Sequence, residues 1–539
     1  MKRALVVLGL SFVGCSNPNP PHTERPVVMS GGATVTRVAP DTLPVLDAWA
    51  NAMGGRAAIS SIRAVHAKGS YERGGMRGTI ELWETASGQR REEIIQGPLR
   101  ELRVFDGTRG WLVDRNREVR ELAAFELDDQ MTLAFIGAHA ALLTDRRAGD
   151  VKLDGDKVVL APDGSRRPAS VWLDRGTHLP DHYEKRDGER TRKITWSDWN
   201  PVGNTGAKLP WSQREENGNP NDAVTIHWTK LEAATPPDAA FAQPADRDPD
   251  MSLASEPVTV PIEAVYGDPS VTKGGLIFVK VSINDQPMSF ILDTGAEATV
   301  LNSSRVSKLG LQGVGTFATG AGGGDVVLSY VPGVTTKVGG ATVSNQIVAA
   351  ILLDDIEKML GRPLDGILGY DFLSRFVIEI DYANQQMRLF DRTKYHHTGS
   401  GKPIAITLED STPFFDASVE IPKRGLLAGH FVLDTGCLCD VQLFTPFVDA
   451  NNLLAALPDA KQSGMSAGAG GQTKEVSASI PSIHIGDVVV KDVRADLARD
   501  TFGAMADPES TGLIGGLTFG RFTLVLDYKS KQVFLDPAK

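Results

Sequence analysis

The chain has 539 residues, of which 41% are hydrophobic and 23% are charged, and its formal net charge is −11. This length allows several domains with their own cores, and the composition is typical of a globular protein. The acidic balance, without a basic stripe interleaved with aromatic residues, argues against nucleic acid as a partner. Beyond the N-terminus no run of about 18 apolar residues occurs, so no internal membrane span is expected.

Residues 1–15 are predicted to be an export signal. Lys2 and Arg3 give a positively charged start, and the apolar run that follows is too short to span a membrane. The run ends in Phe12-Val13-Gly14-Cys15, which resembles the lipobox of bacterial lipoproteins. The resemblance implies that Cys15 is lipidated and that the proline-rich residues 16–40 are a flexible tether.

Lipidation at Cys15 would hold the protein on the periplasmic side of a bacterial cell envelope, with the lipid as its membrane contact. Phe12 differs from the leucine usual at this position, which leaves ordinary signal cleavage open. In that case the protein is expected to be periplasmic or secreted.

A domain boundary is predicted from the tryptophans, all eight of which lie between Trp49 and Trp228. The region 41–234 begins with a predicted helix that carries Leu46, Trp49 and Met53 on one face and stops at Gly54-Gly55. Short alternating strands separated by turn signals follow it.

A second helix is predicted over residues 126–143, with Leu127, Met131, Phe135 and Leu142 facing inward. One antiparallel sheet curved around this helix would bury the pattern, so an α+β half-barrel is expected.

The N-terminal region also resembles the half-barrel of bacterial lipoprotein carriers of the LolA/LolB group. Phe105-Asp106-Gly107 leading to Trp111, and Val171-Trp172-Leu173-Asp174 leading to Leu179-Pro180, carry the likeness. The resemblance implies a lipid or lipoprotein partner, and a plain structural or regulatory module remains the alternative.

The remainder of the chain is an internal duplication. Residues 235–257, rich in proline, alanine and aspartate, are predicted to be a linker. Two lobes follow, 258–392 and 404–539, joined by a connection at 393–403. An internal repeat is strong sequence evidence for a repeated architecture.

Each lobe contains an apolar strand that runs into Asp-Thr-Gly, first at Asp293-Thr294-Gly295 and again at Asp434-Thr435-Gly436. A lone Asp-x-Gly is ordinary turn chemistry. The repeat of a downstream glycine motif, Gly366-Ile367-Leu368-Gly369 and Gly512-Leu513-Ile514-Gly515, makes a turn a poor explanation.

These motifs resemble the lobes of retropepsin-like aspartic proteases. The resemblance implies a mainly β acid protease fold of two lobes, preceded here by the half-barrel domain. It implies an aspartic endopeptidase in which Asp293 and Asp434 hold and activate one water against an extended polypeptide, with no cofactor, metal or covalent intermediate.

In that family Thr294 and Thr435 would lock the two catalytic loops together, while Gly295 and Gly436 would let backbone amides approach the carboxylates. A chain that contains both aspartates has no need of a second subunit, so a monomer is expected. The alternative is a non-catalytic envelope protein that binds peptide or lipoprotein.

Two glycine-rich runs are predicted to be mobile flaps over the substrate, because glycine permits the backbone angles that such hairpin tips need. A merely flexible loop is the alternative for both. The predicted flap residues are Gly320, Ala321, Gly322 and Gly323 in the first lobe and Gly468, Ala469, Gly470 and Gly471 in the second.

Two further features distinguish the catalytic loops. Ala296 and Cys437 stand where pepsin-like enzymes carry a hydroxyl, which predicts a less acidic pair and an optimum nearer about pH 5 to 6 than pH 2. Cys437 and Cys439 are too few for a zinc site. They are expected either to be small semi-buried residues or to form a redox switch.

Overall fold

The computed structural model describes residues 5–6, 35–187, 190–246, 250–265, 274–321, 324–468, 471–501 and 503–538, and it is mainly β. The chain divides into two compact units. The N-terminal unit contains residues 25–247 and 315–317, and the C-terminal unit contains residues 1–24, 248–314 and 318–539.

The N-terminal unit is built on one sheet of 14 strands, in the order β2-β9-β10-β11-β12-β13-β14-β15-β3-β4-β5-β6-β7-β8. The strands are β2 (Thr36–Val38), β3 (Ala64–Arg73), β4 (Met76–Thr85), β5 (Arg90–Gln96), β6 (Leu99–Phe105), β7 (Gly110–Val113), β8 (Val119–Glu121), β9 (Gly149–Asp154), β10 (Lys157–Pro162), β11 (Ala169–Leu173), β12 (Pro180–Asp187), β13 (Arg190–Pro201), β14 (Lys208–Glu216) and β15 (Val224–Ala233). The helices are η1 (Pro40–Thr42), α1 (Leu43–Ala52), α2 (Arg56–Ser61), α3 (Ala124–Gly137) and η2 (Pro220–Asp222).

Helix α1 confirms the prediction for the start of this region. Leu46, Trp49 and Met53 are buried, and Gly54-Gly55 adopt the positive φ angles that end the helix. The side chains of Leu46, Trp49 and Met53 are part of the apolar core of the unit.

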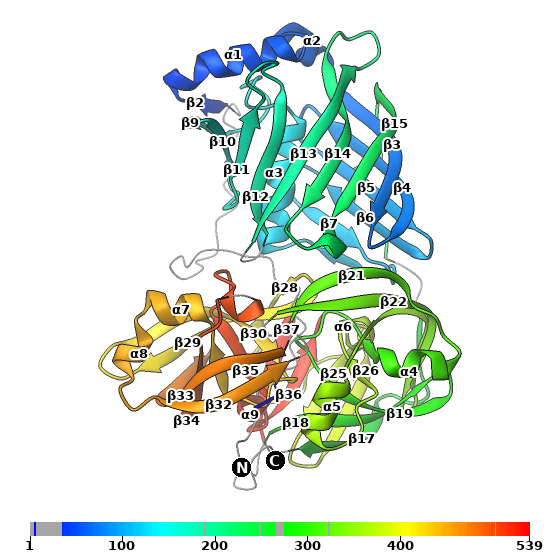
Figure 1. Cartoon of the computed structure of the whole chain (residues 1–539). Helices are drawn as coiled ribbons and strands as arrows, with labels where there is room; N and C mark the ends of the chain where they lie inside the picture. The colour runs from blue at the N-terminus through cyan, green and yellow to red at the C-terminus, as the bar shows by residue number, and fades with distance from the viewer. Residues whose placement is uncertain are drawn as a thin grey trace. The chain divides into compact units, whose positions relative to one another are not determined.

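Helix α3 lies inside the curve of the sheet (Figure 1), because it contacts both β4 and β10, which are well separated in the strand order. It ends at Gly137, short of the predicted end, and residues 138–143 form turns. Phe135 is fully buried as predicted, but Leu127 and Met131 are only half-buried, whereas Asp128 is buried. The inward face of the helix is therefore partly polar.

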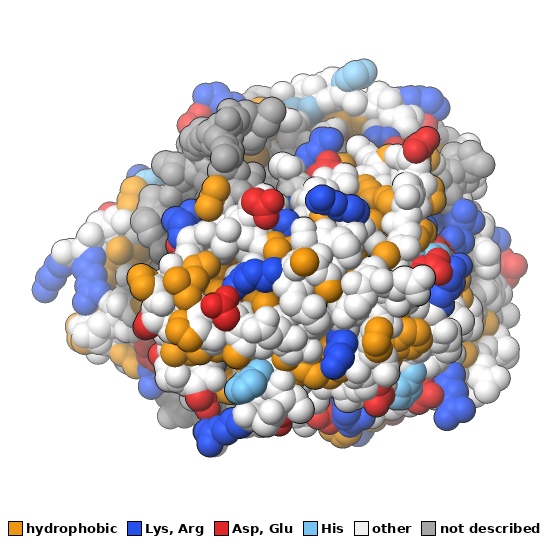
Figure 2. Space-filling view, turned by 90° about the horizontal axis from the view of Figure 1, so that it is seen from above, with side chains coloured by type: hydrophobic (Ala, Val, Ile, Leu, Met, Phe, Trp, Pro, Cys, Tyr) orange, Lys and Arg blue, Asp and Glu red, His pale blue; other side chains and the backbone are white. Residues whose placement is uncertain are grey.

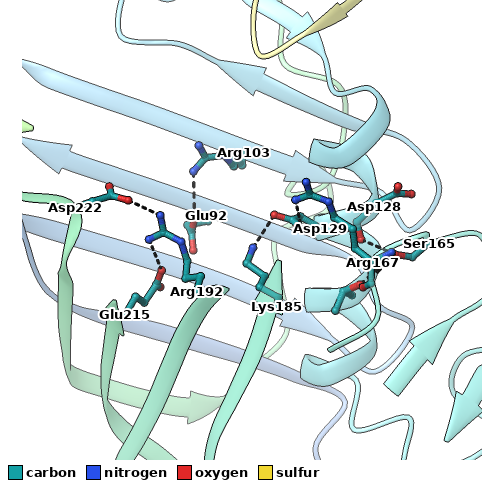
Figure 3. A network of polar contacts seen from close by, with 11 residues as sticks. Glu92, Arg103, Asp128, Asp129, Ser165, Arg167, Lys185, Arg192, Glu215 and Asp222 are labelled. Atoms are coloured by element: carbon teal, nitrogen blue, oxygen red, sulfur yellow. Dashed lines mark hydrogen bonds and ion pairs between the residues drawn. The ribbon is translucent and has the colours of Figure 1, made fainter. Parts of the chain in front are cut away.

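Paired charges explain this polar face (Figure 3). Lys185 donates to Asp129 at 2.6 Å, and Arg192 bridges Asp222 at 2.5 Å and Glu215 at 3.8 Å. The participants come from α3, from the short helix η2 and from strands β5, β6, β12, β13 and β14. An apolar ligand here would have to displace paired charges, which is costly.

The C-terminal unit contains the other two large sheets. Its first-lobe strands are β16 (Met251–Leu253), β17 (Val258–Val265), β18 (Leu276–Ile283), β19 (Gln286–Leu292), β20 (Val300–Asn302), β21 (Val314–Ala321), β22 (Gly324–Val338), β23 (Ala341–Ile351), β24 (Gly366–Leu368), β25 (Phe376–Asp381) and β26 (Gln386–Asp391). The first-lobe helices are α4 (Ser303–Val306), η3 (Ser307–Leu309), α5 (Asp354–Leu360) and α6 (Tyr370–Leu373).

The second lobe repeats this set. Its strands are β27 (Ile404–Ala405), β28 (Thr407–Glu409), β29 (Thr412–Ile421), β30 (Gly425–Asp434), β31 (Val441–Leu443), β32 (Lys461–Gly468), β33 (Gly471–Ile485), β34 (Val488–Ala498), β35 (Gly512–Gly515), β36 (Phe522–Asp527) and β37 (Gln532–Pro537). Its helices are α7 (Thr445–Ala450), α8 (Leu453–Ala456), η4 (Ala504–Ala506) and α9 (Gly516–Phe519). Within residues 1–15 only β1 (Leu5–Val6) is described, parallel to β32; Cys15 lies outside the described residues.

The two lobes share one topology. In the first, β24 runs parallel to β19 and antiparallel to β20; in the second, β35 runs parallel to β30 and antiparallel to β31. In each lobe, a short strand therefore lies between the strand that precedes the aspartate and the strand that follows it, parallel to the first and antiparallel to the second.

A pseudo-twofold axis relates the lobes. Strand β25 of the first lobe pairs antiparallel with β36 of the second, and Glu379 is opposite Val525, its own counterpart in the duplication. On either side the pairing is reciprocal, with Val377 opposite Asp527 and Asp381 opposite Thr523. Such a self-complementary register is the one that a twofold axis requires.

The segment 235–257, which the sequence predicts to be a linker, contains the boundary between the two units and makes contacts on both sides of it. Phe241 is buried in a cluster with Trp83 and Trp111 of the N-terminal unit. On the other side, β16 pairs with β23, and Asp250 forms a buried ion pair of 2.9 Å with Arg375. The sequence does not reveal these partners, because several acidic residues and scattered apolar residues in this stretch look alike.

The described surface agrees with the mixed charge of the sequence. On the face shown in Figure 2, acidic and basic side chains are interspersed with small apolar patches. Among the described residues, no helix is long and apolar enough to cross a membrane.

Candidate active site

Asp293 and Asp434 lie at equivalent ends of two buried strands. Asp293 directly follows β19, and Asp434 is the last residue of β30. The residues before them are apolar and buried because these strands lie in the centre of each lobe. Both aspartates are 0% exposed, which is unusual for a carboxylate.

The structure brings the two carboxyl groups close together, since a Cβ atom placed at Gly295 would lie 2.9 Å from Cγ of Asp434 and 3.3 Å from Oδ1 of Asp293. The glycines of the two motifs make this approach possible. A Cβ atom added at Gly436 would likewise lie 2.4 Å from Cγ of Asp293. Any larger residue would push the pair apart.

Backbone amides hold one oxygen of each carboxyl group. Gly295 N–H donates to Oδ1 of Asp293 at 2.8 Å, and Gly436 N–H donates to Oδ1 of Asp434 at 2.7 Å. The Oδ2 atoms of both residues are buried without a protein hydrogen-bond partner. Each carboxyl therefore has one fixed oxygen and one that can bind a reactant.

Burial shifts the titration of the pair upward. Burial, and then the facing charge of Asp434, raise the pKa of Asp293 well above its usual value. Burial also raises the pKa of Asp434 to about 6, while Asp293 and the amides of Gly436 and Cys437, which lie next to the carboxyl group, oppose the rise. Two adjacent buried carboxyls avoid double ionisation, so the pair keeps a proton.

Thr294 and Thr435 join the two loops. Each hydroxyl accepts a hydrogen bond from the amide of the other threonine, at 3.0 and 3.1 Å. Each also donates to a carbonyl of the opposite strand, Thr294 to Leu433 at 2.7 Å and Thr435 to Leu292 at 3.1 Å. The reciprocal contacts fix the spacing of the neighbouring aspartates.

The predicted flaps fall on two hairpins. Gly320 and Ala321 end β21, and Gly468 and Gly471 flank the turn between β32 and β33. Gly322, Gly323, Ala469 and Gly470 lie outside the described residues.

Cys437 and Cys439 form a disulfide directly after the second motif, and both are buried. The structure thus shows two buried cysteines that are bonded to each other. Their counterparts 141 positions earlier, Ala296 and Ala298, are also buried.

The residue that follows Cys439 in the second loop also differs from its counterpart in the first loop. In the first loop, Thr299 donates its amide to Asp371 at 3.1 Å, and its hydroxyl accepts from Gly369 N–H at 3.4 Å. In the second, the equivalent Asp440 bonds Arg521 at 2.9 Å and accepts from the amide of Arg494 at 3.1 Å.

Sequence reasoning missed two tyrosines near the pair. Tyr382 and Tyr528 match in the duplication, are buried, and have hydroxyls without a partner. Burial and the charge of Asp434 raise the pKa of Tyr382 above its usual value; burial, Tyr370 and Asp293 do the same for Tyr528. The charge of the aspartate in the other lobe thus contributes to the raised pKa of each tyrosine. The repeat shows that the two tyrosines match, but it does not show that each lies near the aspartate of the other lobe.

No group of three or more His, Cys, Asp or Glu side chains that could hold a metal ion occurs within the part of the chain that the structure describes.

Comparison with known proteins points to the same segment. Residues 279–372 match the family model described as "Aspartyl protease". The chain is 25% identical over 240 residues to DNA damage-inducible protein 1 of Kluyveromyces lactis, which covers 43% of this chain and 47% of that protein. The chain thus spans about half the length of this curated relative.

Among solved structures, a DUF1329 family protein from Desulfovibrio piger aligns with 15% identity and a TM-score of 0.27, covering 37% of this chain and 96% of that one. The family match and the geometry agree, because Asp293 lies within residues 279–372, the segment that is similar to aspartyl proteases.

Proposed function

We propose that the chain is an aspartic endopeptidase that uses Asp293 and Asp434 as a catalytic pair. The observation that carries the proposal is the buried, reciprocally braced contact between the two carboxyl groups. A pair that only supported the fold would gain nothing from two buried carboxyls, because burying unneeded charge is costly.

The geometry provides both halves of acid–base catalysis. The ionised carboxyl removes a proton from a water held between the two Oδ2 atoms as that water attacks the scissile carbonyl. The protonated carboxyl donates a hydrogen bond to the carbonyl oxygen. The proton then reaches the leaving amine, and the pair returns to its starting state without a covalent intermediate.

An extended polypeptide is the substrate that this site fits best. The hairpins β21–β22 and β32–β33 offer backbone donors and acceptors, which bind extended chains by strand addition. Pocket residues set the preference among side chains, and the proposal makes no claim about them.

Cleavage of a denatured protein mixture by the purified full chain tests the proposal. Asp293→Asn and Asp434→Asn are each expected to lose at least about a thousandfold of the activity, because a catalytic group acts as part of a unit. Asp355→Asn is the matched control, since that carboxylate is 93% exposed and remote from the pair.

Loss in both site variants and not in the control supports the proposal. Equal activity in wild type and site variants would show that the cleavage comes from elsewhere. A wild-type chain that binds extended peptide without cutting it would favour the alternative of a non-catalytic binding protein.

A further inference from the structure

The Cys437–Cys439 disulfide touches the catalytic machinery through the backbone. The amide of Cys437 donates to the main-chain carbonyl of Asp434 at 3.4 Å and lies close enough to the carboxyl group to lower the pKa of Asp434. The amide of Ala296 does the same for Asp293 in the first loop. The carbonyl of Cys437 accepts from Gly516 N–H at 2.9 Å, and that of Ala296 accepts from Tyr370 N–H at 2.9 Å. The two loops therefore present the same amide to their aspartates.

The two loops hold that amide in different ways. The first loop is anchored by Thr299, whose hydroxyl and amide bond Gly369 and Asp371. In the second, the carbonyl of Asp440 accepts from N–H of Gly515, the counterpart of Gly369, at 3.0 Å, and its side chain bonds Arg521. The covalent link between Cys437 and Cys439 is the feature that only the second loop has.

The disulfide lies in a closed environment. Both cysteines pack in an apolar cluster with Phe414, Phe444 and Met505, and a Cβ atom at Gly515 would lie 2.5 Å from Sγ of Cys439. Two thiols that are no longer bonded need more room than a disulfide, and a close-packed core does not supply it without a shift of the backbone.

We propose that the Cys437–Cys439 disulfide positions the amide of Cys437 against Asp434, so that cleavage by this chain depends on oxidised cysteines. The proposal rests on the proposed endopeptidase function. Reduction by a dithiol transfers two electrons and two protons: the Sγ–Sγ bond breaks, two thiols form, and the dithiol becomes a disulfide.

Kinetics of the purified full chain, oxidised or treated with dithiothreitol, test the proposal. Thiols are counted by alkylation and mass spectrometry. Reduction is expected to lower kcat at least about tenfold with little change in KM, because a small displacement of a reacting group has a large kinetic cost. The acid limb of the pH profile should move to higher pH, since the ionised form of Asp434 loses the stabilising effect of the nearby Cys437 amide.

Three variants make the result specific. Cys15→Ser should respond to the reductant as wild type does. Cys437→Ser/Cys439→Ser, which cannot form the bond, should show the low kcat and shifted acid limb without any reductant. Adding Asp440→Thr to Cys437→Ala/Cys439→Ala introduces the two alanines and the threonine of the first loop and should restore activity that no longer responds to dithiothreitol.

Reduced wild type with unchanged kcat and acid limb would overturn the proposal. If the folded chain resists reduction, the serine double variant decides by the same two readouts. A serine variant that fails to fold by circular dichroism would make the disulfide a general folding element, which also overturns it. Oxidised wild type without activity would instead refute the endopeptidase function.

Discussion

Thr294 and Thr435 exchange hydrogen bonds across the pseudo-twofold axis, each hydroxyl accepting from the amide of the other threonine. Because both are buried, the bonds are shielded from water and connect the two catalytic loops directly. The spacing of Asp293 and Asp434 is therefore a property of both lobes together.

Thr435→Val is expected to lower the free energy of unfolding by about 2 to 4 kcal/mol, since it removes two hydrogen bonds and leaves two buried backbone groups unpaired. Urea denaturation measures the change. Thr435→Ser, which keeps the hydroxyl, should lose much less, and Thr259→Val on an exposed strand position should change little. A valine variant as stable as wild type would contradict the bracing role.

Proteolytic activity is expected to fall as the pH decreases through about 6. Burial raises the pKa of Asp434 to about 6, and below that pH neither carboxyl of the pair remains as a base. The optimum is thus expected at or above the upper end of the range that the sequence predicts. A pH–rate profile with its maximum below about 4 would contradict this assignment.

The raised pKa of Asp434 also makes the stability of the folded chain depend on pH, in the opposite direction to its activity. The pKa of Asp434 is raised from 3.8 to about 6, so between these values the folded chain keeps a proton that the unfolded chain releases. The free energy of unfolding should therefore decrease as pH rises through this window. Urea denaturation across that range should show a smaller decrease in Asp434→Asn, whose side chain does not titrate; an equal decrease would mean that other groups cause it.

A fragment that starts at residue 258 is expected to be less stable than one that starts at residue 248. The shorter fragment loses β16 and the bidentate ion pair of Asp250 with Arg375, whose atoms lie at 2.9 and 3.3 Å. Arg375 is 2% exposed, and a buried charge without its partner costs about 3 to 5 kcal/mol.

Thermal unfolding of the two fragments measures the difference, and Asp250→Asn in the longer fragment isolates the ion pair from the strand. Equal midpoints for both fragments would show that residues 248–257 are a linker after all, as the sequence predicts.

The sequence shows the parts of the site that chemistry restricts to few residue types. The pair of Asp-Thr-Gly motifs and the glycines at a fixed offset were visible because close approach admits only those residues. Asp250 and Asp440 were not visible, since an acidic residue in a loop has many exposed uses and its arginine partner lies far along the chain. The polar interior around Asp129 was missed for the same reason: its partner Lys185 is 56 residues away.

Tyr382→Phe and Tyr528→Phe are each expected to leave stability unchanged or to raise it by about 1 kcal/mol. Both hydroxyls are buried without a partner, and removing such a group relieves a desolvation cost of about 1 to 3 kcal/mol while the ring still fills its space. Chemical denaturation measures the change, with Tyr71→Phe in the N-terminal unit as a comparison. A loss of more than about 1 kcal/mol would mean that the hydroxyl has a bonded partner in solution. In that case the two tyrosines would be part of the polar network of the catalytic pair, because each lies within electrostatic reach of the aspartate of the other lobe.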